Sequence, residues 1–443
     1  MARNGVLIMD NGASTIKVGR SNDTEPRIVS NAVVRSKSDR LTFVGHEIEN
    51  CQDFFGLHYR LPFEKGYLTD WDTEKAIWDK LFSSSGTNVD TRQLSLLVTE
   101  PYFNLSSIQE TYDQLVFEEY EFDSYFRCTP ASLIHHGTLF DEPGLPKPEC
   151  TLIVDSGFSF THVIPLIKGE IIWAGVRRID VGGKLLTNHL KELVSFRHWD
   201  MMDQTYIMND VKEKCCYVST AFKQDLETCY ARPKKNPIVQ EYILPDYTSK
   251  RGGHIRLPND DPEASRDLPI LSMGNERFSV PEVLFNPSDI GLNQAGLAET
   301  IANSISSLQE DLQGMFWGNI GLIGGNVLFP GFEHRLLAEL QPLAPAGYEV
   351  SLYKEQNPVT QAYQAARIFA NSAFYSQKTI SRSEYLEGGS HACSRRFGGN
   401  WKPTSVEEKV REKERTATEQ AEPELGRKAS MVKGSRTRRK STK

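Results

Sequence analysis

The strongest constraint on the fold is a short pattern that occurs twice, in Gly5–Gly19 and in Thr151–Gly169. In each copy an apolar run is followed at once by an aspartate, then by a turn that contains glycine, then by alternating polar and apolar residues. This order predicts a buried strand, a tight turn and a returning strand. The two aspartates, Asp10 and Asp155, lie 145 residues apart, which is about one domain. The repeat predicts two lobes of like topology that close on a shared ligand.

Turns of this kind have chemistry that suits phosphate. Their backbone N–H groups point into one small space and can hold phosphate oxygens. Asp10 and Asp155 at the strand ends can hold a hydrated Mg²⁺, and Lys17 can contact a phosphate as a point charge. Taken alone, one such hairpin is more often plain sheet structure. The candidate turn residues are Asn11, Gly12 and Ser14 in the first copy and Ser156 and Gly157 in the second.

A third stretch, Asn319–Glu333, contains a strand that runs into two adjacent glycines. Gly324 and Gly325 allow the backbone to approach a ligand closely, and Asn326 follows them. Phe329 offers a flat apolar face to a base or a ribose. A strand with a Gly-Gly loop is common on its own. As the third member of an ordered set, it favours a nucleotide clamp over a plain hairpin.

Composition limits the remaining possibilities. The chain has 443 residues, a net charge of −7 and no apolar run long enough to span a membrane. Its seven dispersed cysteines include no C-x-x-C pair, which indicates free thiols in a reducing compartment. Residues 401–443 hold 13 Lys and Arg against 7 Asp and Glu, a net charge of +6, so the other 400 residues carry −13. That acidic part is a poor nonspecific binder of nucleic acid.

Other segments complete the expected organisation. Residues 398–443 are charged and poor in aromatic residues, which predicts a basic disordered tail. A more specific interpretation is that the basic residues at the end of this tail form a nuclear-import signal. Residues 249–268 are rich in Gly, Pro and Asp, which predicts an inserted loop. Apolar periodicity predicts helices over residues 71–82, 108–125, 209–222 and 297–315.

The three stretches, in this order, resemble the actin family within the superfamily of actin, sugar kinases and chaperone ATPases. MDNGASTIKVG and VDSGFSFTHVIPLIKG look like the two phosphate loops of actin, and IGGNVLFPG looks like its adenosine loop. The resemblance covers most of residues 5–397. It implies an α/β, actin-like ATPase fold with two lobes of related topology, or four subdomains, around a nucleotide cleft. Lobe one is residues 1–150, completed by 357–397, and lobe two is residues 151–356.

The resemblance implies ATP or ADP with Mg²⁺ as the ligand, with Asp10 and Asp155 at the metal. VKEKCCYV, residues 211–218, also matches the family and adds Lys212 and Glu213 to the site. The implied nucleotide-binding residues are Asp10, Asn11, Gly12, Ser14, Lys17, Asp155, Ser156, Gly157, Lys212, Glu213, Gly324, Gly325, Asn326 and Phe329.

Departures from the family pattern bear on hydrolysis. Ala13 stands where actin has a serine, and Phe158 and Ser159 stand where actin has Asp and Gly. Gly137 stands where actin has the glutamine that orients the attacking water, with His135 or His136 as possible substitutes. Orienting the nucleophile is much of what phosphoryl transfer asks of a protein. We therefore expect a chain that binds nucleotide with little hydrolysis and has no catalytic residues, rather than an enzyme.

Two further segments, LVFEEYEFDSYF and PVTQAYQAARIFANS, resemble a nuclear branch of the actin family. That resemblance implies a subunit of a chromatin-remodelling complex that exchanges a histone H2A variant into nucleosomes. A short link after Val34 and the polar Asp289 imply that the chain does not form filaments. The implied partners are the remodelling ATPase and its accessory subunits, with the nucleosome contacted indirectly or through the loop and tail, and no membrane. The implied location is the nucleus, with the cytoplasm in addition.

Two other functions stay open at this point. One is an ATP-hydrolysing cytoskeletal actin-like protein, and the other is a small-molecule kinase of the same superfamily. A kinase would need a catalytic carboxylate that faces a sugar pocket, and the sequence offers no candidate for it.

Overall fold

The computed structural model describes residues 5–37, 40–51, 53–231, 236–246, 252–257 and 269–398. Residues up to Gly398 form one compact unit. The predicted disordered tail beyond this residue lies outside the described residues. So does most of the predicted inserted loop, although its described part contains a short strand, β16 (His254–Ile255). The lobe boundaries at residues 150 and 356 stay a prediction.

The first predicted hairpin lies in the middle of a six-stranded sheet with the order β20-β10-β9-β1-β2-β3. Strands β1 and β2 run antiparallel, with Asp10 opposite Lys17, and β1 runs parallel to β9 on its other side. The carboxyl ends of β1 and β9 therefore meet at the edge where the turn after Asn11 lies. The strands are β1 (Val6–Asn11), β2 (Thr15–Arg20), β3 (Arg27–Ser30), β9 (Ser95–Thr99), β10 (Ser124–Cys128) and β20 (Ile380–Ser381).

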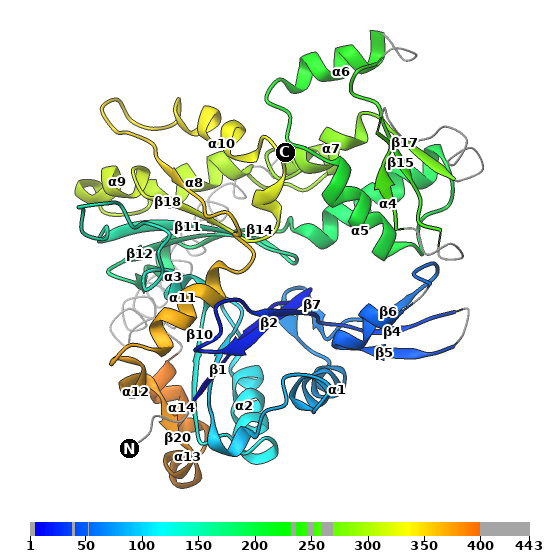
Figure 1. The fold of residues 1–443 in the computed structure, drawn as a ribbon. Coiled ribbons are helices and arrows are strands. Elements are labelled where there is room, and N and C mark those ends of the chain that lie inside the picture. The colour runs from blue at the N-terminus through cyan, green and yellow to red at the C-terminus, as the bar shows by residue number, and fades with distance from the viewer. Residues whose placement is uncertain are drawn as a thin grey trace, which may run out of the picture. The chain divides into compact units, whose positions relative to one another are not determined.

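A second sheet repeats this arrangement around the second predicted hairpin. Strands β11 and β12 run antiparallel, with Asp155 opposite His162, and β11 runs parallel to β18. The order is β13-β12-β11-β18-β19, and β14 also pairs with β12. Figure 1 shows the two sheets in different halves of the described unit. The strands are β11 (Cys150–Ser156), β12 (Thr161–Ile167), β13 (Glu170–Ile171), β14 (Arg177–Ile179), β18 (Ile320–Ile323) and β19 (Leu352–Tyr353).

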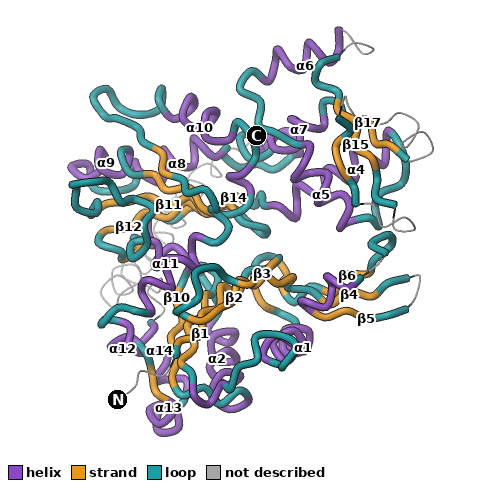
Figure 2. Tube along the Cα trace, in the orientation of Figure 1, coloured by secondary structure: helices purple, strands orange, loops and turns teal. Residues whose placement is uncertain are grey.

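Smaller sheets and helices surround these two sheets, as Figure 2 shows. The small sheets contain β4 (Val33–Arg35), β5 (Thr42–Val44), β6 (His58–Arg60), β7 (Phe63–Glu64), β8 (Tyr67–Leu68), β15 (Gln240–Ile243), β16 and β17 (Ile270–Met273). The helices are α1 (Trp71–Phe82), α2 (Ser106–Gln114), α3 (Pro130–Ile134), α4 (Gly183–Arg197), α5 (Thr205–Cys215), α6 (Phe222–Ala231), α7 (Glu276–Glu282), α8 (Leu297–Ser306), α9 (Glu310–Trp317), α10 (Phe332–Leu340), α11 (Gln361–Ala370), α12 (Tyr375–Lys378), α13 (Arg382–Gly388) and α14 (Ser390–Phe397). None of the described helices has the length and apolar character needed to cross a bilayer.

The core under the first sheet contains large aromatic side chains. Trp78 of α1 and Tyr112 of α2 are fully buried, with ring centroids 6.1 Å apart, and they pack in one cluster with Leu7 and Met9 of β1. Burying one such side chain contributes roughly 1.5–3 kcal/mol. This cluster lies under the strand that carries Asp10, so the packing of α1 and α2 fixes where the first turn begins.

Three predicted helices are wrong in extent. The helix predicted over 108–125 ends much earlier, because α2 passes into a π turn over Leu115–Glu119 and Glu121 adopts a positive φ of 54°. The chain then enters β10. The helix predicted over 209–222 overlaps α5 only up to Cys215, where α5 ends, and the one predicted over 297–315 is two helices, α8 and α9. The helix predicted over 71–82 is confirmed as α1.

Candidate functional site

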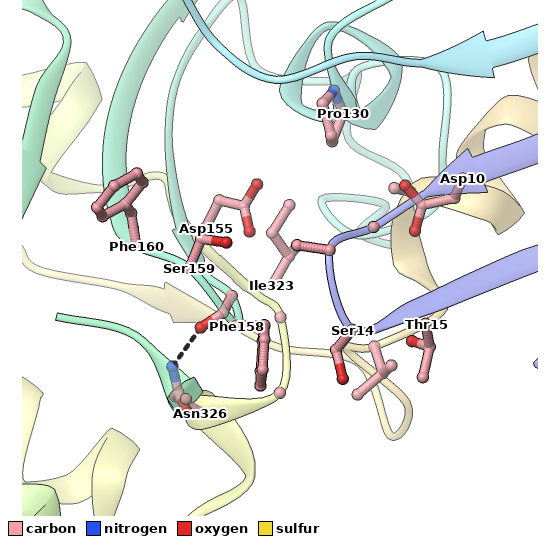
Figure 3. A pocket seen from close by; sticks show the side chains of 18 of the residues that line it. Asp10, Ser14, Thr15, Pro130, Asp155, Phe158, Ser159, Phe160, Ile323 and Asn326 are labelled. Atoms are coloured by element: carbon pink, nitrogen blue, oxygen red, sulfur yellow. Dashed lines mark hydrogen bonds between the residues drawn. The ribbon is translucent and has the colours of Figure 1, made fainter. Parts of the chain in front are cut away.

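The three predicted stretches meet around one cavity of about 510 Å³. This volume lies in the range of small-molecule sites, about 300–1,000 Å³. Figure 3 shows Asp155 left of the centre and Asp10 at the right, with their carboxylates turned toward the space between them. Of the predicted nucleotide-binding residues, those that line the cavity are Asp10, Asn11, Gly12, Ser14, Lys17, Asp155, Gly157, Lys212, Glu213, Gly324, Gly325, Asn326 and Phe329.

Ser156 is the predicted residue that does not line the cavity. Its side chain is fully buried, its hydroxyl lies 2.8 Å from the hydroxyl of Thr161, and it accepts a hydrogen bond from Asn326 Nδ2 at 3.1 Å. The serine therefore joins the second loop to the third and does not point toward a ligand.

Asp10 is held in place by two partners in the first sheet. Its Oδ1 accepts a hydrogen bond of 2.8 Å from the hydroxyl of Thr99, at the carboxyl end of the neighbouring parallel strand. Its Oδ2 lies 3.2 Å from Lys17 Nζ. Asn31 holds the turn through two hydrogen bonds. Its side-chain amide donates to Gly12 O at 3.0 Å, and its backbone N–H donates to Ser14 O at 2.8 Å. The aspartate and the turn are thus positioned without a ligand.

The side chain of Asn11 points away from the cavity. Its Nδ2 donates to Glu74 Oε1 at 2.7 Å and to the hydroxyl of Tyr112 at 2.9 Å. Glu74 is fully buried and also accepts from Trp78 Nε1 at 3.0 Å. Asn11 can therefore contribute only its backbone to the cavity, and its side chain connects the turn to α1 and α2.

Glu74 is a buried carboxyl that holds its proton at a higher pH than an exposed glutamate does. Burial raises its pKa from 4.5 to about 7. Its Oε2 and the neighbouring Asn11 Oδ1 and Asn31 Oδ1 are buried acceptors without a hydrogen-bond donor among the described residues. A protonated carboxyl is itself a donor and can satisfy one of these acceptors. The proton on Glu74 therefore belongs to the polar cluster that supports the first turn.

We expect Glu74→Gln to remove a pH dependence of stability. Between about pH 4.5 and pH 7 the folded chain keeps the Glu74 proton and the unfolded chain loses it, so the free energy of unfolding falls as pH rises through this window. The shift corresponds to a loss on the order of 3 kcal/mol. Glutamine stays neutral, so the variant should match the wild type near pH 5 and exceed its stability at pH 8. Denaturant unfolding at both pH values measures this difference. The control is Asp72→Asn, an exposed carboxylate on the same helix, and an equal Glu74→Gln effect at both pH values would contradict the expectation.

Asp155 lies at the end of β11 and is bound by a tyrosine from the other sheet. The hydroxyl of Tyr102, in the loop after β9, donates to Asp155 Oδ2 at 2.8 Å. Burial raises the pKa of Asp155 to about 6. The imidazole of His162 lies beside the tyrosine ring, with centroids 4.7 Å apart, and burial lowers the pKa of this histidine to about 3. The second loop thus presents one carboxylate and one neutral imidazole.

The two phenylalanines of the second loop have different surroundings. Phe158 lines the cavity. The Cζ atom of Arg178 lies 4.5 Å from the centroid of the Phe160 ring, over its face. Phe160 also lies against Gly66 in the turn between β7 and β8. Gly66 has a positive φ of 77°, and a side chain there would meet the Phe160 ring at 2.7 Å. Phe160 therefore packs against the first half of the chain, while Phe158 occupies a place where a smaller side chain would leave room.

The third loop is tied to the second by its asparagine. Asn326 Nδ2 donates to Gly157 O at 2.8 Å, which is the dashed line in Figure 3. Phe329 is 8% exposed and belongs to the core cluster under the second sheet, so it contributes an edge of the cavity wall. Gly325 has open space around its Cα on the cavity side, with no atom within 4 Å of an added Cβ.

Lys212 and Glu213 reach the cavity from α5. Lys212 is 4% exposed, and its ammonium donates to Thr187 Oγ1 at 2.9 Å and to Asn209 Oδ1 at 2.8 Å; burial lowers its pKa. Glu213 accepts from Asn209 Nδ2 at 2.6 Å. These contacts order the wall of the cavity, whereas Lys17 pairs with Asp10.

The residues around the cavity suit a nucleotide with Mg²⁺. Mg²⁺ is usually held by one or two carboxylates plus phosphate oxygens and waters, and Asp10 and Asp155 supply that donor set. In the part of the chain that the structure describes, no group of three or more His, Cys, Asp and Glu residues could hold a metal by itself. The donor set therefore fits a metal that arrives with phosphates better than a site made by protein ligands alone.

Sequence reasoning missed the residues that hold the site together. Thr99 and Tyr102 follow a buried apolar strand, and the carboxyl ends of neighbouring parallel strands are where ligand sites form. That signal could have placed both at the cavity. Asn31 and Glu74 had no such signal, because their roles depend on contacts between distant segments. The suggested water-orienting histidines lie elsewhere: the ring centroid of His136 lies 4.6 Å from that of Phe369, and neither His136 nor His135 lines the cavity.

Comparison with known proteins agrees with the resemblance seen in the sequence. A family model described as "Actin" matches residues 1–398. The chain is 51% identical over 419 residues to "Actin-like protein ARP6" of Cryptococcus neoformans var. neoformans serotype D (strain B-3501A), which covers 90% of this chain and 85% of that protein. It is 38% identical to "Actin-related protein 6" of Drosophila melanogaster, over 89% of this chain and all of that protein. It is 40% identical to "Actin-like protein ARP6" of Yarrowia lipolytica (strain CLIB 122 / E 150), over 89% of this chain and 97% of that protein.

Proposed function

The chain belongs to the actin family, as its sequence resemblance predicted, and from this premise we propose that it is a nuclear, non-polymerising actin-related subunit that holds a nucleotide with little hydrolysis. In this proposal it serves a chromatin-remodelling complex that exchanges a histone H2A variant into nucleosomes. The bound ATP or ADP, with Mg²⁺, stabilises the closed arrangement of the two halves by mass action.

The observation that carries the nucleotide part is the cavity between the two sheets. Three loops from two equivalent sheets meet there, and each is fixed by hydrogen bonds within the protein. Asp10 and Asp155 would hold the metal, and Lys17 would contact a phosphate. When bound, Mg²⁺ would neutralise phosphate charge between the two aspartates. The backbone N–H groups of the first turn supply further donors for phosphate oxygens.

One observation supports weak hydrolysis. In the second loop, Phe158 brings an apolar ring to the cavity, and this ring can neither bind nor order water. Gly137, the position that the resemblance assigned to the water-orienting glutamine, does not line the cavity and packs against Ala365 of α11.

We expect the purified chain to bind ATP and ADP and to turn ATP over very slowly. Equilibrium binding is measured with a fluorescent ATP analogue and competing unlabelled nucleotide, and turnover by release of phosphate. Asp10→Asn is the matched variant, because it keeps the size of the side chain and removes a predicted metal ligand, and it should weaken binding in Mg²⁺. Turnover at about 1 s⁻¹ or more, the low end of ordinary enzymes, would contradict the proposal.

Support for the partner class comes from the resemblance of LVFEEYEFDSYF and PVTQAYQAARIFANS to a nuclear branch of the family. The remodelling ATPase, its accessory subunits and the nucleosome are the proposed partners, and the nucleus, with the cytoplasm in addition, is the proposed location. Affinity purification of the tagged chain from nuclear extract, with identification of partners, tests this part. Recovery of cytoskeletal proteins alone, or filaments that sediment in Mg²⁺ and salt, would overturn it.

A further inference from the structure

Tyr102 connects the two halves of the chain at the cavity. It lies in the loop after β9 of the first sheet, and its side chain is 5% exposed. Its hydroxyl donates to Asp155 Oδ2 at 2.8 Å and accepts from the backbone N–H of Ala131, at the start of α3, at 3.1 Å. Its ring lies 4.7 Å from the imidazole of His162. One side chain therefore contacts the second sheet through a carboxylate and a histidine, and α3 through a backbone amide.

These contacts matter because hydrolysis needs a held water. The water oxygen must bond to the γ-phosphorus as the bond to the bridging oxygen breaks, and a nearby group must accept the proton that the water loses. Among the described residues that line the cavity, Asp155 and His162 lie together on the second hairpin and are suited to this task by position. Tyr102 donates to one oxygen of the first, and its ring lies beside the ring of the second.

The other acidic groups of the cavity have different engagements. Asp10 accepts from Thr99 and pairs with Lys17. Glu213 accepts from Asn209. Glu100 accepts from Asn104 and Gln109 and lies 3.3 Å from the Arg127 guanidinium. The best proton acceptors for a water that attacks a bound phosphate are thus Asp155 and His162, the two residues that Tyr102 contacts.

We propose that Tyr102 is a positioning residue that holds Asp155 across the cleft and excludes the attacking water, so that nucleotide is retained and little cleaved. This inference rests on the nucleotide binding proposed above. While the phenol donates to Asp155 Oδ2, this carboxylate has one acceptor site fewer for a metal-bound water. The chain therefore binds nucleotide with less dependence on Mg²⁺ than a site with both carboxylates open.

Two variants separate the contribution of the Tyr102 hydroxyl from that of its ring. Tyr102→Phe keeps the ring beside His162 and removes the hydroxyl that donates to Asp155 Oδ2. Tyr102→Ala also removes the ring beside the imidazole and opens a space for water. The matched control is Tyr353→Phe, because the hydroxyl of Tyr353 donates to Glu142 at the same distance of 2.8 Å and Tyr353 does not line the cavity.

The experiment measures the affinity for a fluorescent ATP analogue in Mg²⁺ and in EDTA, and phosphate release in Mg²⁺, for all four proteins. For Tyr102→Phe we expect the ratio of the two affinities to rise about tenfold over wild type, which is the usual worth of one hydrogen bond to a charged group. For Tyr102→Ala we expect faster phosphate release as well. Tyr353→Phe should match wild type in both.

The possible failures are distinguishable. If wild type binds no nucleotide in either condition, the proposed function fails and this inference fails with it. If wild type binds nucleotide and Tyr102→Phe leaves the Mg²⁺ dependence unchanged, the inference alone is overturned. Should Tyr102→Ala fold poorly, Tyr102→Phe still decides the question, because it removes a single oxygen and keeps the ring packing.

Discussion

Replacing Arg127 by methionine is expected to lower the free energy of unfolding by about 3–5 kcal/mol, the usual cost of removing one partner from a buried ion pair. The Arg127 side chain is 2% exposed and lies between two carboxylates, with Nη1 2.8 Å from Asp113 Oδ1 and Nε 3.3 Å from Glu100 Oε2. Both carboxylates are nearly as buried. Without the guanidinium they would remain in the interior as uncompensated negative charges. Denaturant unfolding measures the loss.

The loss should depend on pH. Burial raises the pKa of Asp113 to about 7 even with Arg127 beside it, and without the arginine this carboxyl would hold its proton more strongly. A neutral carboxyl no longer needs the guanidinium, so the loss should be smaller at pH 5 than at pH 8. The control is Arg92→Met, because Arg92 pairs with Glu121 at 2.7 Å but is 73% exposed, and exposed pairs contribute less than about 1 kcal/mol. Equal losses for Arg127→Met and Arg92→Met would show that burial does not set the value of the pair.

Substitution by alanine should affect stability very differently at Gly324 and Gly325, the adjacent glycines of the third loop. Gly324 has a positive φ of 95°, and an added Cβ would lie 2.3 Å from Ser156 O, a backbone atom. Conformational strain alone costs roughly 1–2 kcal/mol, and the contact requires the second and third loops to separate. We expect Gly324→Ala to lower the free energy of unfolding by more than about 2 kcal/mol and to abolish nucleotide binding.

Gly325 is the matched neighbour. Its φ is −74°, and an added Cβ meets no atom within 4 Å. Gly325→Ala should therefore keep the stability of wild type, or raise it by a few tenths of a kcal/mol. Because this glycine faces the cavity, the variant should still bind nucleotide more weakly. Unfolding and nucleotide titration of both variants test the pair. If Gly325→Ala bound nucleotide as wild type does, the third loop would not approach the ligand at this residue.

Local chemistry explains why the hairpins could be predicted. An apolar run, an aspartate and a glycine-containing turn determine the strand and its reversal within a few residues, so β1 with β2 and β11 with β12 follow from the sequence. The carboxyl ends of the strands then place Asp10 and Asp155 at the cavity. The duplicated pattern also indicated that two such turns face one ligand, which the lining of the cavity agrees with.

Contacts between distant segments explain what could not be predicted. Asn11 was predicted to bind nucleotide, and it lines the cavity, but its side chain donates to a buried carboxyl 63 residues away, which no local pattern indicates. Tyr102 reaches Asp155 across 53 residues, and no spacing in the sequence indicates that contact. The predicted helix over 108–125 failed for a related reason. Its apolar periodicity continues past the π turn, and only the pairing of β10 with β9 and β20 shows that residues 124–128 form a strand.

The edge strand β20 gives the chain an order of assembly. The second sheet is built from residues 150–353, and its hairpin and parallel partner are complete before the last ninety residues of the chain. The first sheet begins at Val6 and receives its last strand at Ile380, which pairs with Tyr125. On a ribosome, domains generally form as units while the chain emerges. The second sheet can therefore form first, and the first sheet is complete only after β20 has been synthesised. A nascent chain truncated near residue 375 would expose an open strand edge at β10, which is the kind of surface that pairs with other chains.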